Sequence, residues 1–107
     1  MKERVVAEVS IIPVGTSDTG LSHYIASCIE VLEGSKDLTY RLTPMGTVIE
    51  GSLDRILEAV SKMHEVPFSK GALRVVTHLK IDDRRDKPAT MTGKVESVLK
   101  LRPSIKA

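Results

Sequence analysis

The sequence predicts a ferredoxin-like α+β domain of βαββαβ order with an extra C-terminal helix. Three observations carry this prediction: four segments rich in β-branched residues, two one-sided apolar stripes of helical period between them, and a length of 107 residues. That length suits one core, so residues 1–107 are expected to form a single domain. A hydrophobic fraction of 41% and a charged fraction of 28% are typical of a folded chain.

The first half of the chain reads as strand, turn and helix. Residues 4–12 alternate, with Val5, Ala7, Val9 and Ile11 on one face. Proline and glycine in residues 13–20 indicate a loop. From residue 21 the apolar side chains recur every three or four positions, which predicts a helix that stops at residue 34.

The second half repeats the plan after a hairpin. Residues 38–43 and 47–50 read as strands joined at residues 44–46. A helix is expected from Ser52 as N-cap to Pro67 and Gly71, and a strand over residues 73–81. A final helix is expected from about Lys94 to Pro103. The side chains expected to face inward in the second helix and its strand are Leu53, Ile56, Leu57, Val60, Met63, Leu73, Val75, Thr77, Leu79 and Ile81.

Two right-handed crossovers would place both helices on one face of an antiparallel sheet and leave the other face open. This face mixes polar and apolar side chains, so we expect it to pack on another subunit in a homodimer or homotetramer. Its predicted members are Val6, Glu8, Ser10, Ile12, Thr39, Arg41, Thr43, Arg74, Val76, His78 and Lys80.

Composition argues against several classes of protein. A net charge of +2 and an aromatic fraction of 3% lack the basic field and stacking side chains of nucleic-acid binders. The single cysteine, Cys28, indicates a buried thiol in a reducing compartment. No segment reads as a signal peptide or membrane span, so a cytoplasmic location is expected.

Catalytic and metal-binding motifs are missing from the sequence. His23, His64 and His78 fall on different predicted elements, so neither a metal nor another cofactor is expected. We expect His78 to be structural on the open face. An enzyme that uses carboxylates and His78 across a subunit interface is the least favoured alternative.

Several polar residues have two readings. Glu8 and Glu50 lie within apolar strands, so each is either functional or paired with Arg41 or Arg74. The loop at residues 15–17 could hold an anion before the first helix. The favoured reading is that Ser17, Asp18 or Ser22 caps that helix. The charged run at residues 82–86 reads as a solvated loop.

Three segments, AEVSIIPVGT, YRLTPMGTVIEG and RVVTHLKIDDRRD followed by KVESV, resemble the thiamine-binding-protein family in order and spacing. The resemblance covers nearly the whole chain. It implies a cytoplasmic ferredoxin-like subunit that forms dimers and tetramers and binds thiamine or its pyrimidine moiety without transforming it. The residues carried over to the implied pocket are Glu8, Ser10, Gly15, Thr16, Thr43, Met45, Gly46 and Thr47.

Ligand chemistry extends this expectation. A carboxylate and a hydroxyl, from Glu8 and Ser10, could recognise the aminopyrimidine, whereas Glu50 and Tyr24 could face the cationic thiazolium. A site around Arg41 and Arg74 would instead favour a phosphorylated ligand. The leading hypothesis is therefore a non-enzymatic binder of a thiamine-like small molecule, and the alternative is a regulatory or assembly module that holds an anionic metabolite at a subunit interface.

Overall fold

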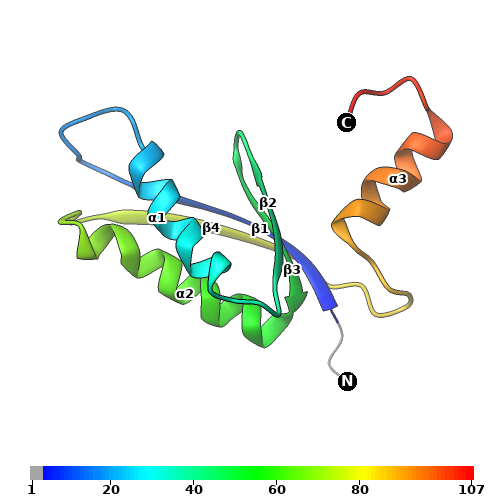
Figure 1. Cartoon of the computed structure of the whole chain (residues 1–107), viewed down its shortest axis with the longest axis horizontal. Coiled ribbons are helices and arrows are strands. Elements are labelled where there is room, and N and C mark those ends of the chain that lie inside the picture. The colour runs from blue at the N-terminus through cyan, green and yellow to red at the C-terminus, as the bar shows by residue number, and fades with distance from the viewer. Residues whose placement is uncertain (1–3) are drawn as a thin grey trace.

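A computed structural model describes residues 4–107 of the chain, which form four strands and three helices (Figure 1). The elements in chain order are β1 (Arg4–Pro13), α1 (Ser22–Glu33), β2 (Thr39–Thr43), β3 (Gly46–Ser52), α2 (Leu53–Ser69), β4 (Val75–Asp82) and α3 (Met91–Leu101).

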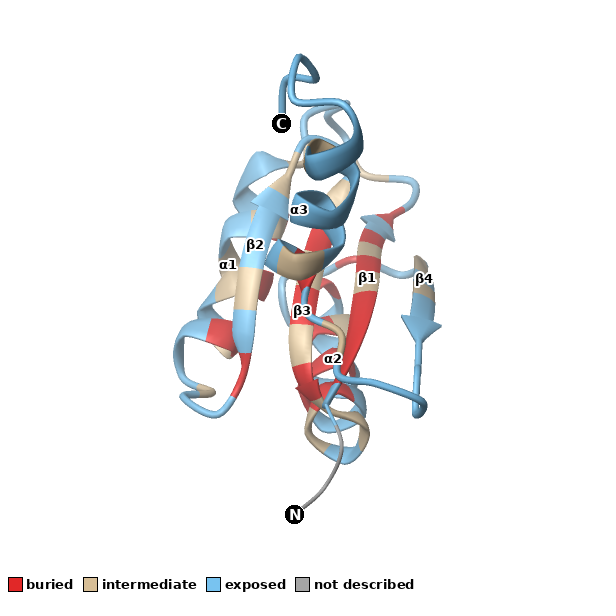
Figure 2. Cartoon of the chain, turned by 90° about the vertical axis from the view of Figure 1, so that its right-hand side faces the viewer, coloured by how far each residue is buried: buried red, intermediate tan, exposed pale blue. Residues whose placement is uncertain are grey.

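The strands form one antiparallel sheet in the order β2-β3-β1-β4. Helices α1 and α2 lie side by side on one face of this sheet, and α3 lies on the opposite side (Figures 1 and 2). This arrangement confirms the predicted ferredoxin-like fold with an additional C-terminal helix. None of the helices in residues 4–107 is long and apolar enough to cross a lipid bilayer.

The core lies between the two central strands and helices α1 and α2 (Figure 2). The alternation predicted for β1 is confirmed, because its odd-numbered residues from Val5 to Ile11 are buried. They pack with Leu32 of α1, Ile49 of β3 and Ile56 of α2. Strand β1 therefore contributes one side-chain face to the core and the other to the open side of the sheet.

Strand register confirms most of the predicted open face. Glu8 pairs with Lys80 and Ser10 pairs with His78 across the β1–β4 ladder, so these side chains share the face away from α1 and α2. Arg74 precedes β4 and lies outside the sheet. The start of α3 is fixed to this side, because the Met91 amide donates a 2.9 Å hydrogen bond to the Glu50 carboxylate.

Three positions that were predicted to face inward are exposed, namely Leu57, Leu73 and Ile81. Leu57 of α2 is exposed, and Ala59 is buried beside Ile56 instead. A buried stripe at residues 56, 59, 60 and 63 leaves residue 57 on the outer side of a 3.6-residue helix. Leu73 is 94% exposed because the last strand begins only at Val75.

Helix termini also differ from the predictions. Ser17, Asp18 and Ser22 do not cap α1; its N-cap is Leu21, and the Asp18 carboxylate accepts a 3.0 Å hydrogen bond from the Gly20 amide. Ser52 is the N-cap of α2, although its side chain makes no capping hydrogen bond. The last helix begins at Met91 rather than near Lys94, because the Thr90 hydroxyl caps it by accepting from the Gly93 amide.

Helix α2 continues past the residue that was predicted to end it. Pro67 lies inside the helix, which runs to Ser69. Proline has no amide hydrogen, so the Met63 carbonyl loses its usual helical donor. The Cys28 thiol of α1 points at that carbonyl, with Sγ 3.4 Å from the oxygen. A thiol therefore replaces the missing amide at the contact between the two helices.

Candidate functional site

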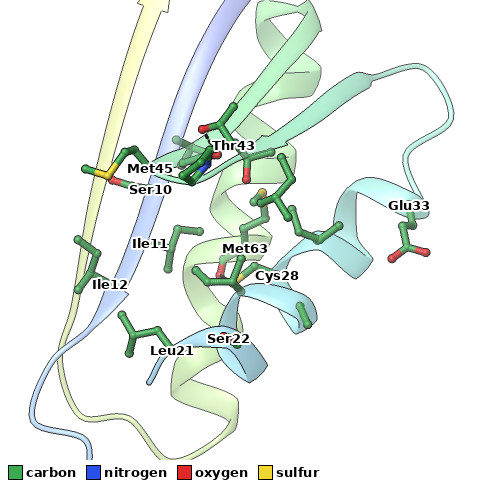
Figure 3. A pocket seen from close by; sticks show the side chains of 18 residues that line it. Ser10, Ile11, Ile12, Leu21, Ser22, Cys28, Glu33, Thr43, Met45 and Met63 are labelled. Atoms are coloured by element: carbon green, nitrogen blue, oxygen red, sulfur yellow. Dashed lines mark hydrogen bonds between the residues drawn. The ribbon is translucent and has the colours of Figure 1, made fainter. Parts of the chain in front are cut away.

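A pocket of about 780 Å³ opens between α1, the end of β1 and the tip of the β2–β3 hairpin (Figure 3). Its volume falls within the range of roughly 300–1,000 Å³ that is common for small-molecule sites. The lining is mainly apolar and consists of Val9, Ser10, Ile11, Ile12, Leu21, Ser22, Ile25, Ala26, Cys28, Ile29, Glu33, Leu42, Thr43, Pro44, Met45, Gly46, Thr47 and Met63.

The pocket exists because β1 is longer than its pairing with β3. The β1–β3 ladder ends at the pair of Val9 with Thr47, whereas the β1–β4 ladder continues to the pair of Pro13 with Val75. Beyond Val9, the edge of β1 that faces the hairpin has no paired strand residue. The pocket occupies this unpaired stretch, and Ile11 and Ile12 of β1 line it.

Turn chemistry explains why the hairpin leaves β1 at this point. Pro44 and Met45 form a two-residue loop between the paired residues Thr43 and Gly46. Both loop residues have negative φ angles, since no non-glycine residue among those described has a positive φ. The loop is therefore not one of the primed turns that match strand twist, and unprimed turns splay the hairpin.

Gly46 sets how closely the hairpin approaches β1. A β-carbon at this position would lie 3.0 Å from the Val9 carbonyl oxygen and 3.5 Å from Cγ of Glu8. The lack of a side chain thus allows β3 to begin against the main chain of β1. The Thr43 hydroxyl also closes the hairpin by donating a 2.8 Å hydrogen bond to the Gly46 carbonyl.

Few polar groups reach the pocket. Thr47 is 4% exposed, and its hydroxyl has no hydrogen-bond partner among the residues that the structure describes. Such a group at the wall of a pocket is available to a ligand. Ser10, Ser22 and Thr43 add hydroxyls, and Glu33, at the end of α1, is the one charged residue of the lining (Figure 3).

Cys28 also lines the pocket, next to Met63. Burial raises the pKa of its thiol, which therefore stays protonated at neutral pH. The protonated thiol is the form that donates to the Met63 carbonyl. Cys28 thus presents a neutral thiol, already engaged with Met63, at the wall of the pocket.

Half of the residues expected at the site come together here. Ser10, Thr43, Met45, Gly46 and Thr47 all line the pocket. They come from β1 and from both sides of the hairpin turn, which the β1–β3 ladder places next to each other.

The other half lie elsewhere. Glu8 is on the open face with Lys80, whose Nζ is 3.7 Å from the carboxylate. The Glu50 side chain holds α3 and lies 3.6 Å from Arg4, so the expected pairing of either glutamate with Arg41 or Arg74 is wrong. Gly15, with φ of 77°, shapes the loop after β1, where the Thr16 hydroxyl donates to the Asp18 carbonyl. Tyr24 is buried in α1, and its ring centroid lies 4.2 Å from that of His23.

Sequence reasoning missed the contribution of α1. Leu21, Ile25, Ile29 and Glu33 line the pocket, but the first three read simply as part of the apolar core stripe. The sequence did offer one signal, the number of apolar residues in α1, because this helix carries more of them than the three that are buried in the core. No group of three or more potential metal ligands occurs among residues 4–107.

The fold and this cavity define a small ferredoxin-like domain with a pocket of ligand size. Comparison with known proteins agrees, because residues 7–99 match the family model described as thiamine-binding protein. The chain belongs to this family.

Relatives and solved structures support that assignment. The UPF0045 protein YqgV of Bacillus subtilis is 46% identical over 98 residues, which cover 89% of this chain and 94% of the relative. A crystal structure from Methanocaldococcus jannaschii superposes with a TM-score of 0.81 at 43% identity, covering 90% of this chain and 96% of the other.

A second solved structure carries a functional name. It comes from Thermotoga maritima and is provisionally named for thiamine biosynthesis or salvage. The TM-score is 0.71 at 25% identity, and the match covers 89% of this chain and 98% of the other.

Proposed function

We propose that this protein binds thiamine, or a related molecule that contains the same pyrimidine, without transforming it and as a homo-oligomer. The observation that carries the proposal is the pocket between α1 and the hairpin in a chain of the thiamine-binding protein family. Its apolar walls suit a flat heteroaromatic ring, and its few hydroxyls suit the polar edge of that ring.

The charge at the pocket favours a cationic or neutral ligand over an anionic one. Glu33 is acidic, and neither Arg41 nor Arg74 belongs to the lining. A carboxylate at the rim attracts a thiazolium cation and repels a phosphate. This argues against the alternative function, in which the site holds an anionic metabolite.

The character of the lining supports binding without catalysis. It contains no histidine, and its cysteine is kept protonated by burial. His78 is not part of the lining, although it pairs across the β1–β4 ladder with Ser10, which is. The one carboxylate of the lining, Glu33, therefore has neither a histidine nor a reactive thiol beside it in the cavity with which to share proton transfer.

Isothermal titration with thiamine, thiamine phosphates and the free hydroxymethyl pyrimidine tests the proposal. We expect thiamine and the pyrimidine to bind and the phosphates to bind more weakly. Glu33→Gln should weaken thiamine several-fold, on the scale of a partly exposed ion pair, and leave the neutral pyrimidine unchanged. Absence of heat with both unphosphorylated ligands would refute the function, and preference for phosphates would favour the anionic alternative.

The open side of the sheet supports self-association with a second copy. Val98 and Leu101 of α3 are 51% and 83% exposed, and Ile12 of β1 is exposed on the sheet. Two pairs of opposite charge on this side lie within the chain, Glu8 with Lys80 and Asp82 with Lys94. Two copies could therefore meet without strong repulsion.

Sedimentation velocity tests this part of the proposal. We expect a dimer or tetramer that Val98→Asp dissociates, because a carboxylate would be buried against apolar surface. Leu73→Asp is the control, since Leu73 is an apolar residue outside the sheet that is even more exposed than Val98. A monomeric unmodified protein at micromolar concentration would contradict self-association.

A further inference from the structure

The unpaired edge of β1 at the pocket has a defined polarity. The Val14 amide donates a 2.8 Å hydrogen bond to the Arg74 carbonyl of the neighbouring segment, which continues the register of the β1–β4 ladder. In an antiparallel strand, the main-chain groups of successive residues point alternately to the two sides. Even-numbered residues of β1 therefore bond toward β4, and odd-numbered residues point toward β3.

Ile11 is the odd-numbered residue of β1 that has no pairing partner in β3. Val9, the preceding odd-numbered residue, makes the last pair with β3, and Pro13, the next one, has no amide hydrogen. By register, Ile11 would face Met45, but Met45 belongs to the turn and is not paired with it. The N–H and C=O of Ile11 thus face the vacated edge together.

Burial makes this pair of groups significant. Ile11 is 3% exposed and lines the pocket. Buried main-chain donors and acceptors are almost always satisfied. A donor and an acceptor on the same residue of a free strand edge form a ready-made pairing site, as in recognition by strand addition.

We propose that the main-chain N–H and C=O of Ile11 read the 4-aminopyrimidine edge of the ligand: the N–H donates to the ring nitrogen, and the C=O accepts from the exocyclic amine. This inference rests on the proposed function and assigns the recognition element within it. Thr47, which lies beside Val9 in the ladder, offers a hydroxyl that can donate or accept and adds affinity without setting this polarity.

The test is a comparison of thiamine with its 4-oxo analogue by isothermal titration. The analogue has a carbonyl in place of the amine and a hydrogen on the neighbouring ring nitrogen, so both hydrogen-bond roles are inverted. Two mismatched buried groups should weaken binding by about 100-fold or more. Thr47→Val should weaken both ligands by a similar factor and leave their ratio unchanged, because the valine keeps the shape and removes only the hydroxyl.

Amide hydrogen exchange followed by NMR gives a second readout. Thiamine should slow exchange of the Ile11 amide, whereas the Ala7 amide, already paired in the β1–β3 ladder, is the internal control. Equal affinity for thiamine and its 4-oxo analogue, or loss of the preference in Thr47→Val, would overturn the assignment while the proposed function stands. If neither ligand binds, the proposed function fails and the assignment fails with it.

Discussion

Adding one methyl group at Gly46 should separate the hairpin from β1. The β-carbon of alanine would lie 3.0 Å from the Val9 carbonyl oxygen, which is closer than ordinary van der Waals contact. That oxygen belongs to the main chain of the last paired residue in the β1–β3 ladder and cannot rotate away as a side chain could. We expect Gly46→Ala to cost about 1–3 kcal/mol of unfolding free energy, the usual range for overpacking.

The assay is thermal and urea denaturation, combined with titration of thiamine. A loss of 1 kcal/mol lowers the melting temperature of a domain of this size by about 4–8 °C. Thiamine affinity should fall as well, because the hairpin tip forms one wall of the pocket. Gly20→Ala is the matched control, since its β-carbon would meet only the Asp18 carboxylate, at 3.7 Å. If Gly46→Ala is as stable as the control and binds thiamine equally well, the hairpin does not depend on this close approach.

Three further predictions follow from other contacts. The Arg55 guanidinium donates to Asp37 at 2.6 Å and lowers the pKa of that carboxyl. The pair therefore stabilises the fold above about pH 4, and this contribution disappears as pH falls through the folded-state pKa. Asp37→Asn should lower the urea midpoint at pH 7 but not in strong acid, and a difference that persists in acid would contradict this. The Cys28 thiol should react slowly with a disulfide reagent, and more slowly still with thiamine bound, as followed by absorbance; rapid modification would show that the wall opens. Replacing Pro44 and Met45 by Asn-Gly should favour a primed turn, stabilise the hairpin and reduce thiamine binding. Unchanged thiamine affinity would show that the turn type does not determine the shape of the pocket.

Much of the fold was predictable because the patterns in this chain are strong. The alternation in β1 and the apolar stripe of α1 each commit one face to the core, and together they determine the topology. Errors occurred where local chemistry admits more than one outcome. Pro67 could be kept inside α2 because the Cys28 thiol serves the carbonyl that the proline leaves without a donor. A contact between two helices cannot be read from the sequence of either one.

The site was only half predictable for a different reason. Ser10, Thr43 and Thr47 carry polar side chains at strand ends, which sequence inspection identifies. Glu8 and Glu50 have the same kind of signal, but Lys80 and the start of α3 engage them on the open side of the sheet. Ile11 gave no signal at all, since its role depends on which strand stops pairing first.

The unpaired stretch of β1 has a consequence for how such a site can change during evolution. Groups supplied by the peptide bond survive every substitution at position 11 except proline, which would remove the donor. Mutational drift in the surrounding walls could alter the size of the ligand or the chemistry of its far end while the polarity of the strand edge stays constant. Divergent members could thus retain one chemical preference without sharing any side chain that displays it, and a search restricted to invariant polar residues would overlook the element that discriminates.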